Sequence, residues 1–504
     1  MSIDMKSTAS RILFAVIAIE FVDGILGAYY TPLVVPLARS VGLHDSDWNW
    51  VEAAQTLLGA IVIPLLTRFG DRFGHKKAML VTVIVTAGAA WWVVAGGGFV
   101  SVLLAFSLLS FSSVWMALEL ALVRSSVGEG ADADERVSAT SAALIVAFMI
   151  GSVGAAIFGG QFFTASGGWD ALQGAIGAGV PPSTVAQFTH ALRLTLLVPA
   201  IGITVLVPLV VFLVPETKPR QLPRQDLAGL VFLIGILVLI VGGLSVVKLL
   251  GLSSPVGWIV IGIALVLVYP FGRHQLRTDE PTLDLRLLRQ REVWPFQAMS
   301  LLLGVGYTAT QIPLITFAST DPASAGFGLA ADTGDISIVM AVMILAISIT
   351  AGLLTAFGKR VNKLTLLRLA PFIHACEFII FLFLHTQMWH AYLAVGVGGV
   401  GAGILVAWLP AAAANAAPPG KTATLVGLTS LTRVIGTALG SAAFAVILST
   451  VGHQKGTAAS LAGYLTVFSV AIAASVTGGI LLRAARPPLS APITESALAE
   501  AKEN

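Results

Sequence analysis

The sequence predicts an all-α membrane protein, built as two pseudo-symmetric six-helix bundles plus two inserted helices, with 14 transmembrane helices in total. Its 504 residues are 56% hydrophobic and 11% charged, with a mean hydropathy of +0.90, whereas a soluble domain carries roughly 25% charged residues. Fourteen apolar segments are long enough to cross about 30 Å of hydrocarbon, and a short motif of the first half recurs in the second. This composition excludes a soluble enzyme.

The predicted spans alternate with short polar loops. They cover residues 12–39, 48–67, 78–97, 100–123, 138–163, 191–214, 227–249, 255–272, 293–318, 335–357, 364–386, 389–413, 422–450 and 458–482. The first span follows Arg11 as the core of a signal peptide would, but it is longer and contains Glu20 and Asp23. A signal-peptide core is short and lacks acids, so this segment is predicted to remain as a transmembrane helix.

The basic residues predict the orientation of the spans. Of the 29 Lys and Arg residues, 24 fall on the side where the chain starts, 4 on the opposite side and 1 inside a span. Basic residues concentrate on the cytoplasmic side of membrane proteins, so both termini are predicted to be cytoplasmic. The loop between spans 9 and 10 agrees, because it holds Asp321, Asp332 and Asp335 and no basic residue. The predicted location is the cell membrane, either inner or plasma membrane.

The chain also repeats itself. The segment LLTRFGDRFGHKK from Leu65 follows span 2, and LLTAFGKRVNKLT from Leu353 follows span 10. Matching hairpins in two halves indicate a duplicated six-span unit, the usual architecture of transporters whose site lies between the halves. Chance similarity of two basic loops is less favoured, because the apolar positions match as well. The predicted domains are residues 1–214, an inserted pair of helices in 215–292, and residues 293–504.

The segment from Gly70 to Lys77, GDRFGHKK, resembles the signature of the major facilitator superfamily between spans 2 and 3. Over nearly its whole length the chain is similar to the fourteen-span drug/proton antiporter branch of that superfamily. Other residues that carry this resemblance are Asp23 and Pro32 in span 1, Arg136, Gly151, Gly159 and Gly160 in span 5, and Arg433, Gly436 and Gly440 in span 13. The resemblance implies a role in conformational gating for Gly70, Asp71, Arg72, Gly74, Lys76, Arg136, Gly151, Gly159 and Gly160.

Three features depart from the branch. Ala155-Ala156 stand where its span-5 signature has Gly-Pro, and Ser107, Ser110 and Phe111 stand where its span 4 has an arginine and a Gln-Gly pair. That arginine is linked to proton movement in the branch. The third departure is a long Gly/Pro-rich external stretch, residues 164–189, which is either a lid or, as we favour, a surface elaboration.

Six charged residues are predicted to lie inside spans: Glu20, Asp23, Glu52, Glu119, Glu377 and Arg433. A charge at mid-bilayer costs at least about 3 kcal/mol, so each needs a partner, a hydrated cavity or a function. One arginine cannot pair with every carboxylate, so some of the carboxyl groups are predicted to be protonated or to face water. That property suits a proton-coupled carrier.

The candidate residues for proton coupling and substrate binding are Asp23, Glu20, Glu52, Glu119, Tyr30, Glu377 and Arg433. Glu20, Asp23, Gly27 and Tyr30 share one helical face and would line a cavity well. The alternative for each acid is a structural role: hydrogen bonding between helices for Glu20 and Asp23, solvation near the external interface for Glu52, and a salt bridge to Arg124 or Arg433 for Glu119.

No metal site or cofactor is predicted. His374, Cys376 and Glu377 are close in sequence, but Cys376 points away from the helical face that His374 and Glu377 share. Polar packing is therefore the favoured interpretation of these residues.

The predicted function is secondary active transport, specifically proton-coupled export of amphipathic, drug-like compounds, including cationic ones, by alternating access. The sequence holds no G-x-x-x-x-G-K-[ST] motif for ATP. The predicted partners are the small-molecule substrate, protons and, through Arg72, Lys76 and Lys77, membrane lipids; the small net charge of +3 is scattered and indicates no nucleic acid. The alternatives are an exporter or flippase-like carrier of a lipid or an endogenous metabolite and, less favoured, a membrane enzyme or receptor that transports nothing.

Overall fold

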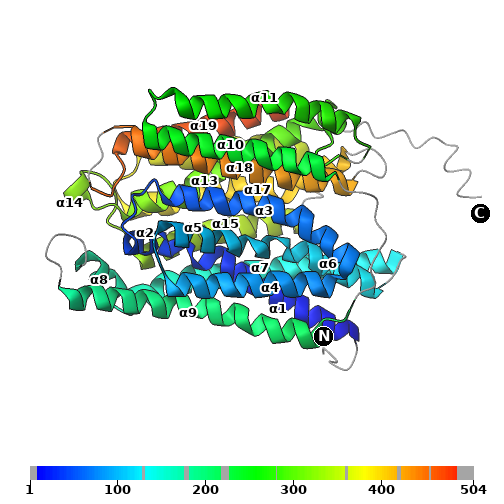
Figure 1. The fold of residues 1–504 in the computed structure, drawn as a ribbon, viewed down its shortest axis with the longest axis horizontal. Helices are drawn as coiled ribbons and strands as arrows, with labels where there is room; N and C mark the ends of the chain where they lie inside the picture. The colour runs from blue at the N-terminus through cyan, green and yellow to red at the C-terminus, as the bar shows by residue number, and fades with distance from the viewer. Residues whose placement is uncertain are drawn as a thin grey trace, which may run out of the picture.

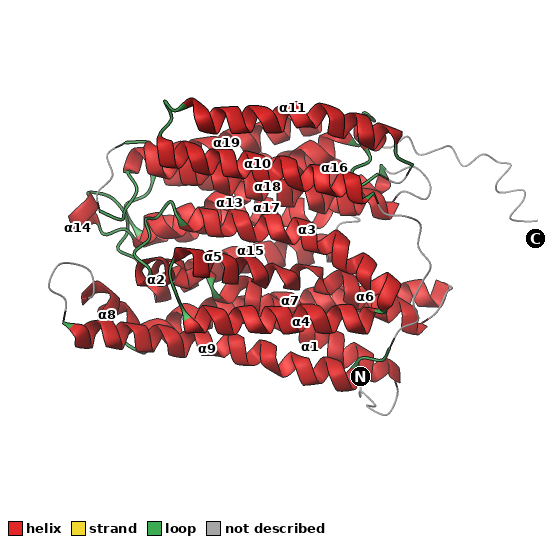
Figure 2. Ribbon diagram, viewed as in Figure 1, coloured by secondary structure: helices red, strands yellow, loops and turns green. Residues whose placement is uncertain are grey.

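Long helices lying side by side form the whole molecule (Figure 1). The computed structural model describes residues 8–127, 131–174, 181–216, 226–279, 281–357, 361–416, 422–452 and 456–484. Over these residues Figure 2 shows helices and loops only. Fourteen helical segments are long and apolar enough to cross a membrane, which confirms the predicted fold class and number of spans.

The helices fall into two bundles and an inserted pair. The N-terminal bundle consists of α1 (Thr8–Tyr29), η1 (Thr31–Leu33), α2 (Val34–Ser40), α3 (Trp48–Phe73), α4 (His75–Ala95), α5 (Phe99–Leu109), η2 (Ser110–Val114), α6 (Trp115–Val127), α7 (Ala131–Ala165), α8 (Gly168–Gly174) and α9 (Pro182–Leu213). The inserted pair is α10 (Leu227–Leu250) and α11 (Pro255–Arg277). A short helix, α12 (Leu285–Leu288), leads from the inserted pair to the C-terminal bundle. That bundle consists of α13 (Trp294–Ser319), α14 (Pro322–Ala325), α15 (Thr333–Phe357), α16 (Lys363–Phe383), α17 (Met388–Asn415), α18 (Thr422–Thr450) and α19 (Leu461–Arg483).

The molecule has two ends. One, on the left in Figure 1, carries α2, α8, α14 and the loop around Asp45, and we call it the Asp45 end. The other, on the right, carries the turn between α3 and α4 beside Asp71, and we call it the Asp71 end.

Spans 1 and 4 are interrupted, which the continuous predicted spans 12–39 and 100–123 missed. In span 1 the helix gives way to η1 at Pro32, because proline cannot donate the backbone hydrogen bond that would continue α1. In span 4 the hydroxyls of Ser107 and Ser110 donate to backbone oxygens at Leu103 and Ser107, each at 2.6 Å. Such side-chain bonds compete with the helical ladder, and the 3-10 turn η2 begins at Ser110.

The sixth span starts earlier than predicted. The apolar pattern placed it at 191–214, whereas α9 begins at Pro182, where proline occupies the first helical turn and its missing N–H costs nothing. The predicted Asp71 loop is also corrected. Residues Gly70 to Phe73 form the last turn of α3, and α4 begins at His75, because Gly74 alone makes the reversal with a φ of 105°.

Each bundle is held by a close helix crossing built on glycine. In the N-terminal bundle α1 packs on α7, and a Cβ added at Gly151 would lie 2.2 Å from the backbone oxygen of Phe21. In the C-terminal bundle α13 packs on α18, and a Cβ at Gly436 would lie 1.9 Å from the backbone oxygen of Leu301. Close approach of backbones through small residues is a main source of helix association in lipid. The two crossings show the internal repeat in three dimensions.

Two seams join the bundles: α3 packs on α18, and α7 packs on α15. The inserted helix α10 lies along the first seam, where its residues around Val247 contact Trp50 and Ala53 of α3 and Ala442 of α18. Helix α11 packs on α10 on the side away from the bundles (Figure 1).

Asp226 anchors the inserted pair at the Asp71 end. Four groups donate to its carboxylate or pair with it at 2.7 to 3.2 Å: His274 Nε2, the Gly229 N–H, Gln275 Nε2 and the Thr282 N–H. Burial opposes ionisation of Asp226, but these hydrogen bonds outweigh it and lower the pKa of the carboxyl from 3.8 to about 2. The network joins the start of α10 to the end of α11 and to Thr282, in the segment that leads from α11 towards the C-terminal bundle.

Asp226→Asn should therefore lower the unfolding free energy of the purified protein by about 2 kcal/mol at neutral pH. Because the folded pKa lies below the unfolded one, this stabilisation is present above about pH 4 and is lost as the pH falls towards about 2. Thermal unfolding followed by tryptophan fluorescence should show a gap between wild type and variant that narrows below about pH 4. The exposed Asp279→Asn serves as the control, and an equal gap at all pH values would contradict the assignment.

Candidate functional site

A polar cavity lies between the two bundles. Its larger part has a volume of about 410 Å³ and borders α1, α3, η2, α7, α13 and α18. A second part of about 290 Å³ extends towards α15 and α17. The two parts share the residues Gly27, Thr31, Phe148, Tyr307, Gln311 and Arg433. A site between two halves, with walls from both, is the usual position of the substrate in this architecture.

Two carboxyl groups line the wall that the N-terminal bundle contributes. Asp23 projects from α1 and interacts with the hydroxyl of Ser112 in the interrupted span 4. Glu52 projects from α3 and is partly accessible to solvent. Among the described residues neither carboxylate forms a salt bridge, so both are available to a proton or to a cationic group.

Arg433 lines the opposite wall. It lies near the middle of α18, yet its side chain is accessible to water because it faces both parts of the cavity. The phenol of Tyr307 is within electrostatic range of its guanidinium. The cavity is thus acidic on the N-terminal bundle and basic on the C-terminal bundle.

A cluster of aromatic side chains lines the cavity on the side of the Asp45 end. The rings of Tyr30 and Phe106 are 5.2 Å apart, and those of Trp48 and Phe106 are 5.1 Å apart, both edge to face. The Tyr30 hydroxyl is buried and has no hydrogen-bond partner among the described residues. The cluster gives the site an apolar surface beside its charges.

Glu20 and Glu119 do not reach the cavity. Glu20 lies one turn before Asp23 on α1, but its carboxyl is buried against that of Glu119 from α6, inside the N-terminal bundle. Two carboxylates in contact repel each other unless they share a proton. The alternative of a salt bridge between Glu119 and Arg433 is wrong, since Arg433 lies in the other bundle and faces the cavity.

Glu377 also lies away from the cavity, in the C-terminal bundle. The Thr310 hydroxyl donates to Glu377 Oε1 at 2.8 Å, and His374 Nδ1 lies 3.6 Å from Glu377 Oε2. All three side chains are buried. Inside the bundle Glu377 therefore packs against both Thr310 and His374. Over the described part of the chain no group of three metal-ligating residues occurs.

Several polar residues of the cavity are not among the predicted site residues. They are Gln55, Ser110, Ser112, Ser113, Tyr307, Gln311 and Thr437. Uncharged polar residues are common in apolar helices, so their type alone gives no signal. The serines do give a sequence signal, because three serines within four residues weaken a helix and mark the interruption of span 4.

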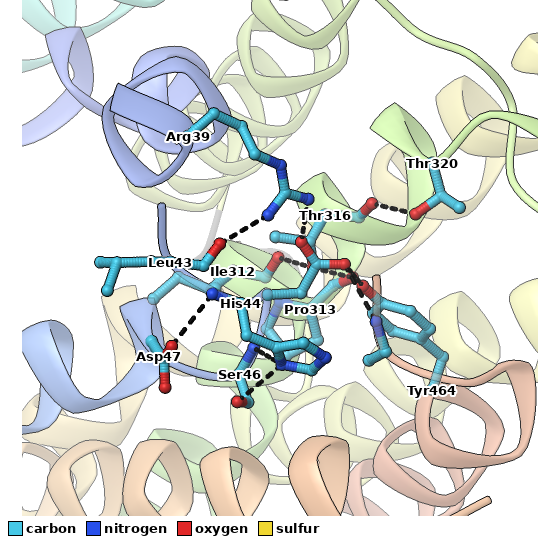
Figure 3. A network of polar contacts seen from close by, with 12 residues as sticks. Arg39, Leu43, His44, Ser46, Asp47, Ile312, Pro313, Thr316, Thr320 and Tyr464 are labelled. Atoms are coloured by element: carbon cyan, nitrogen blue, oxygen red, sulfur yellow. Dashed lines mark hydrogen bonds and ion pairs between the residues drawn. The ribbon is translucent and has the colours of Figure 1, made fainter. Parts of the chain in front are cut away.

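The Asp45 end is closed by polar contacts between the bundles (Figure 3). The Arg39 guanidinium forms a salt bridge with Asp45 Oδ1 at 2.5 Å, and the Tyr464 hydroxyl of α19 donates to Asp45 Oδ2 at 2.8 Å. The Asp45 N–H donates to the backbone oxygen of Thr457 at 3.0 Å. Lys248 of α10 forms a salt bridge with Asp47. Loops of both bundles and the inserted pair therefore meet at this end.

The second seam is closed at the same end through Gly160. Its backbone oxygen accepts from the Thr333 hydroxyl of α15 at 3.2 Å, and Gln161 donates to the backbone oxygen of Gly334 at 3.1 Å. A Cβ added at Gly160 would lie 2.0 Å from the Thr333 oxygen. Gly151 and Gly159, by contrast, face α1 of their own bundle. Of the three predicted gating glycines on α7, only Gly160 meets the other bundle.

The predicted gating residues at the Asp71 end contact their own bundle. Asp71 Oδ1 lies 3.1 Å from His75 Nε2 across the Gly74 turn, and the Arg72 guanidinium lies over the Phe73 ring. A Cβ at Gly70 would meet Leu118 of α6 at 2.9 Å.

Lys76 caps a neighbouring helix. Its Nζ donates at 2.8 Å to the backbone oxygen of Val211, one of the carbonyls at the end of α9 that have no partner within the helix. The side chain of Arg136, in α7, lies outside the described part of the chain.

A separate cavity of about 390 Å³ lies within the N-terminal bundle at the Asp45 end, between α2, α4, α5 and α9. It holds Arg39 and Arg193 but borders neither seam. We place the functional site in the cavity between the bundles, which we call the central cavity, because α1, α3 and α7 of one bundle and α13 and α18 of the other all border it.

A membrane-spanning chain with a charged cavity between two helical bundles defines a solute transporter. The family model described as Major Facilitator Superfamily matches residues 14–441, so the chain belongs to the major facilitator superfamily. Membership makes the protein a transporter and not an enzyme, as predicted.

Solved structures share the fold at low sequence identity. The peptide transporter POT in complex with sulfate is 15% identical with a TM-score of 0.65, over 96% of this chain and 98% of that one. The nucleoside transporter NupG is 12% identical with a TM-score of 0.61, over 95% and 99%. The human organic anion transporter MFSD10 (TETRAN) is 16% identical with a TM-score of 0.54, over 94% and 99%. No curated protein matches the sequence.

Gly160→Ala should destabilise the closed Asp45 end. Its Cβ would meet the Thr333 backbone, and overpacking of this kind costs about 1–3 kcal/mol, so the closed arrangement should lose about tenfold in population relative to an open one. Spin labels at Asp170→Cys and Ser324→Cys, in a Cys376→Ser background, should report a longer distance between the bundles.

Gly154→Ala is the matched control on the same helix, because nothing lies within 4 Å of its added Cβ. Identical distance distributions in the two variants would show that Gly160 does not limit the closure.

Proposed function

We propose that the protein is a proton-coupled secondary transporter of the fourteen-span drug/proton antiporter branch, which exports amphipathic, drug-like compounds by alternating access. One observation carries the proposal: Asp23 and Glu52 line a cavity between the bundles, and neither has a cationic partner among the described residues. A carboxyl group in this position can hold either a proton or a cationic group of the substrate. Competition between the two for the same carboxyl couples their movements in opposite directions.

In this proposal residues 1–214 and 293–504 move as two bodies, and the inserted pair, residues 215–292, accompanies them. The geometry fits the state that is closed at the Asp45 end, because the hydrogen bonds from Tyr464 to Asp45 and from Thr333 to Gly160 join the two bundles there. The other state would break these bridges and close the Asp71 end.

In this proposal the protonation state of Glu52 affects the contact between the bundles. Ser441 Oγ, on α18, lies 2.7 Å from the backbone oxygen of Asn49 and 3.0 Å from Glu52 Oε2. Its single hydrogen can be donated fully to only one of these two oxygens. The Asn49 oxygen can only accept, so a protonated Glu52 completes the set by donating to Ser441. Loss of the proton leaves two acceptors facing one donor across the α3–α18 seam, which favours opening.

The residues at the Asp71 end take a gating role in the proposal. Asp71 sits at the C-terminal end of α3, where the helix dipole disfavours an acid, so a second state in which it meets a basic group would be stabilised. Gly70, Arg72, Gly74 and Lys76 shape and anchor this turn, and Arg136 is proposed as a member of the same group. Lys359, at the matching place of the second half, lies outside the described residues.

The orientation remains the one that the basic residues predict. Both termini and the Asp71 end face the cytoplasm, the Asp45 end faces outside, and the protein resides in the cell membrane with Arg72 and Lys76 near anionic lipid head groups. A state closed at the Asp45 end is then closed towards the outside, as an exporter must be while it takes up substrate from the cytoplasm.

A second candidate is a carrier of a lipid or an endogenous metabolite. Arg433 favours it, because a site that takes only cations has no use for an arginine on its wall.

The orientation predicts opposite labelling of two engineered cysteines. In a Cys376→Ser background, a membrane-impermeant thiol reagent should label Ser324→Cys in α14 of intact cells and should miss Arg291→Cys between α12 and α13; both positions are exposed. After the membrane is permeabilised, both should react. Labelling of Arg291→Cys alone in intact cells would reverse the proposed orientation.

Asp23→Asn should abolish proton-driven transport without unfolding the protein. The amide keeps the shape of the side chain and its interaction with Ser112 but cannot release a proton. We expect purified Asp23→Asn to be monodisperse and to accumulate substrate at least about tenfold more slowly in proteoliposomes with a pH gradient. Exchange of substrate down its own gradient should persist.

The exposed Asp170→Asn in α8 is the control for removal of one carboxyl group. If pH-driven transport survives in Asp23→Asn, the coupling role passes to Glu52. If the wild-type protein moves no proton with any of a panel of amphipathic compounds, proton coupling itself is wrong.

A further inference from the structure

We propose that Arg433 forms an anion subsite in the central cavity, so that the transported compound is amphoteric: it carries a carboxylate or similar anionic group as well as a basic one. This inference names the substrate class of the proposed function and rests on it. Four steps support it.

The first step is the position of Arg433. It lies near the middle of α18 at the junction of the two parts of the cavity, so its guanidinium can be reached from either part. The side chain is accessible to water although the helix around it is packed against α13 and α3. A ligand in the cavity can therefore contact it directly.

The second step is the lack of a counter-ion. Among the described residues no carboxylate forms an ion pair with Arg433 and no side chain hydrogen-bonds its guanidinium. A charge left unpaired within a membrane protein is costly and is retained where it has a function. The anion that would balance it must enter with the ligand or the solvent.

The third step is the chemistry around the guanidinium. Tyr307 and Gln311 border the same shared surface one helical turn apart on α13. A guanidinium offers two parallel N–H groups that match the two oxygens of a carboxylate, and a phenol or amide beside it adds further donors. The set suits a planar anionic group better than it suits a halide ion.

The fourth step is the opposite wall. Asp23 and Glu52 face the cavity from the N-terminal bundle, and the ring cluster of Tyr30, Trp48 and Phe106 lines the same cavity towards the Asp45 end. A ligand with a basic group, an apolar body and an acidic group would touch all three surfaces at once. Such a ligand bridges the two bundles, so its binding energy acts on the equilibrium between states of the transporter.

A rival role for Arg433 is internal. In another state of the cycle it could pair with Asp23 or Glu52, in which case its removal would affect every substrate alike. A matched pair of ligands separates the two roles.

The test uses a rhodamine that carries a free carboxylate and its methyl ester, which share the cationic ring system and differ in the anionic group. Equilibrium binding of each dye to purified protein is measured by fluorescence anisotropy, independently of any proton gradient. Arg433→Gln should weaken binding of the carboxylate dye about tenfold or more, since a hydrogen bond to a charged group is lost, and should change binding of the ester less than about twofold. Arg433→Lys should fall between, because it keeps the charge but not the two-pronged geometry.

Arg193→Gln is the control, since it removes a basic residue that lines only the separate cavity of the N-terminal bundle. Equal weakening of both dyes, no change for either, or no binding of the carboxylate dye to the wild type would each overturn the subsite. Selective weakening together with an absence of pH-driven transport would uphold the subsite and refute the proposed proton coupling, so the two failures are distinguishable. Size-exclusion profiles of all variants identify any that fail to fold.

Discussion

The cost of a charge in a membrane interior governs how the whole molecule is arranged. The six acidic or basic residues that the sequence predicts to lie at mid-bilayer are each placed where that cost is met. Glu20 and Glu119 meet inside one bundle, Glu377 is held by Thr310 inside the other, and the remaining three face the cavity between them. The cavity thus receives the three of these charges that are not enclosed within one bundle, and both bundles contribute to its walls.

Hydropathy and charge were sufficient to predict the fourteen spans and the fold class, because these depend on composition over a whole helix. They also singled out Asp23, which lies on the wall of the cavity. The repeat at Leu65 and Leu353 predicted two related bundles, which the paired glycine crossings display. Glu20 shows where such reasoning stops. Helical periodicity places it on the face of Asp23, but only a residue distant in sequence, Glu119, decides that it turns inward. The partner of Glu52, Ser441, is 389 positions away and is likewise invisible to local patterns.

The two ends of the molecule are held by different kinds of contact. At the Asp45 end, side chains of one bundle reach backbone and side-chain groups of the other, as Tyr464 does with Asp45. At the Asp71 end, the hydrogen bond of Lys76 and the ion pair of Asp71 stay within one bundle. Hydrogen bonds between bodies that must separate are individually weak, worth about 0.5–1.5 kcal/mol each, so several of them together can hold a state firmly while each can be exchanged for water in turn.

The position of α10 makes the two seams unequal. It lies along the contact of α3 with α18, whereas α7 and α15 meet with no inserted helix of the described chain upon them. A fluctuation that parts α3 from α18 therefore exposes the cavity to another protein surface, but one that parts α7 from α15 exposes it to the acyl chains of the bilayer. A compound dissolved in the membrane could therefore enter the cavity laterally only through the seam between α7 and α15. The exposed side chains of Phe158 on α7 and of Leu345 and Ile349 on α15 would line the entrance to this lateral route.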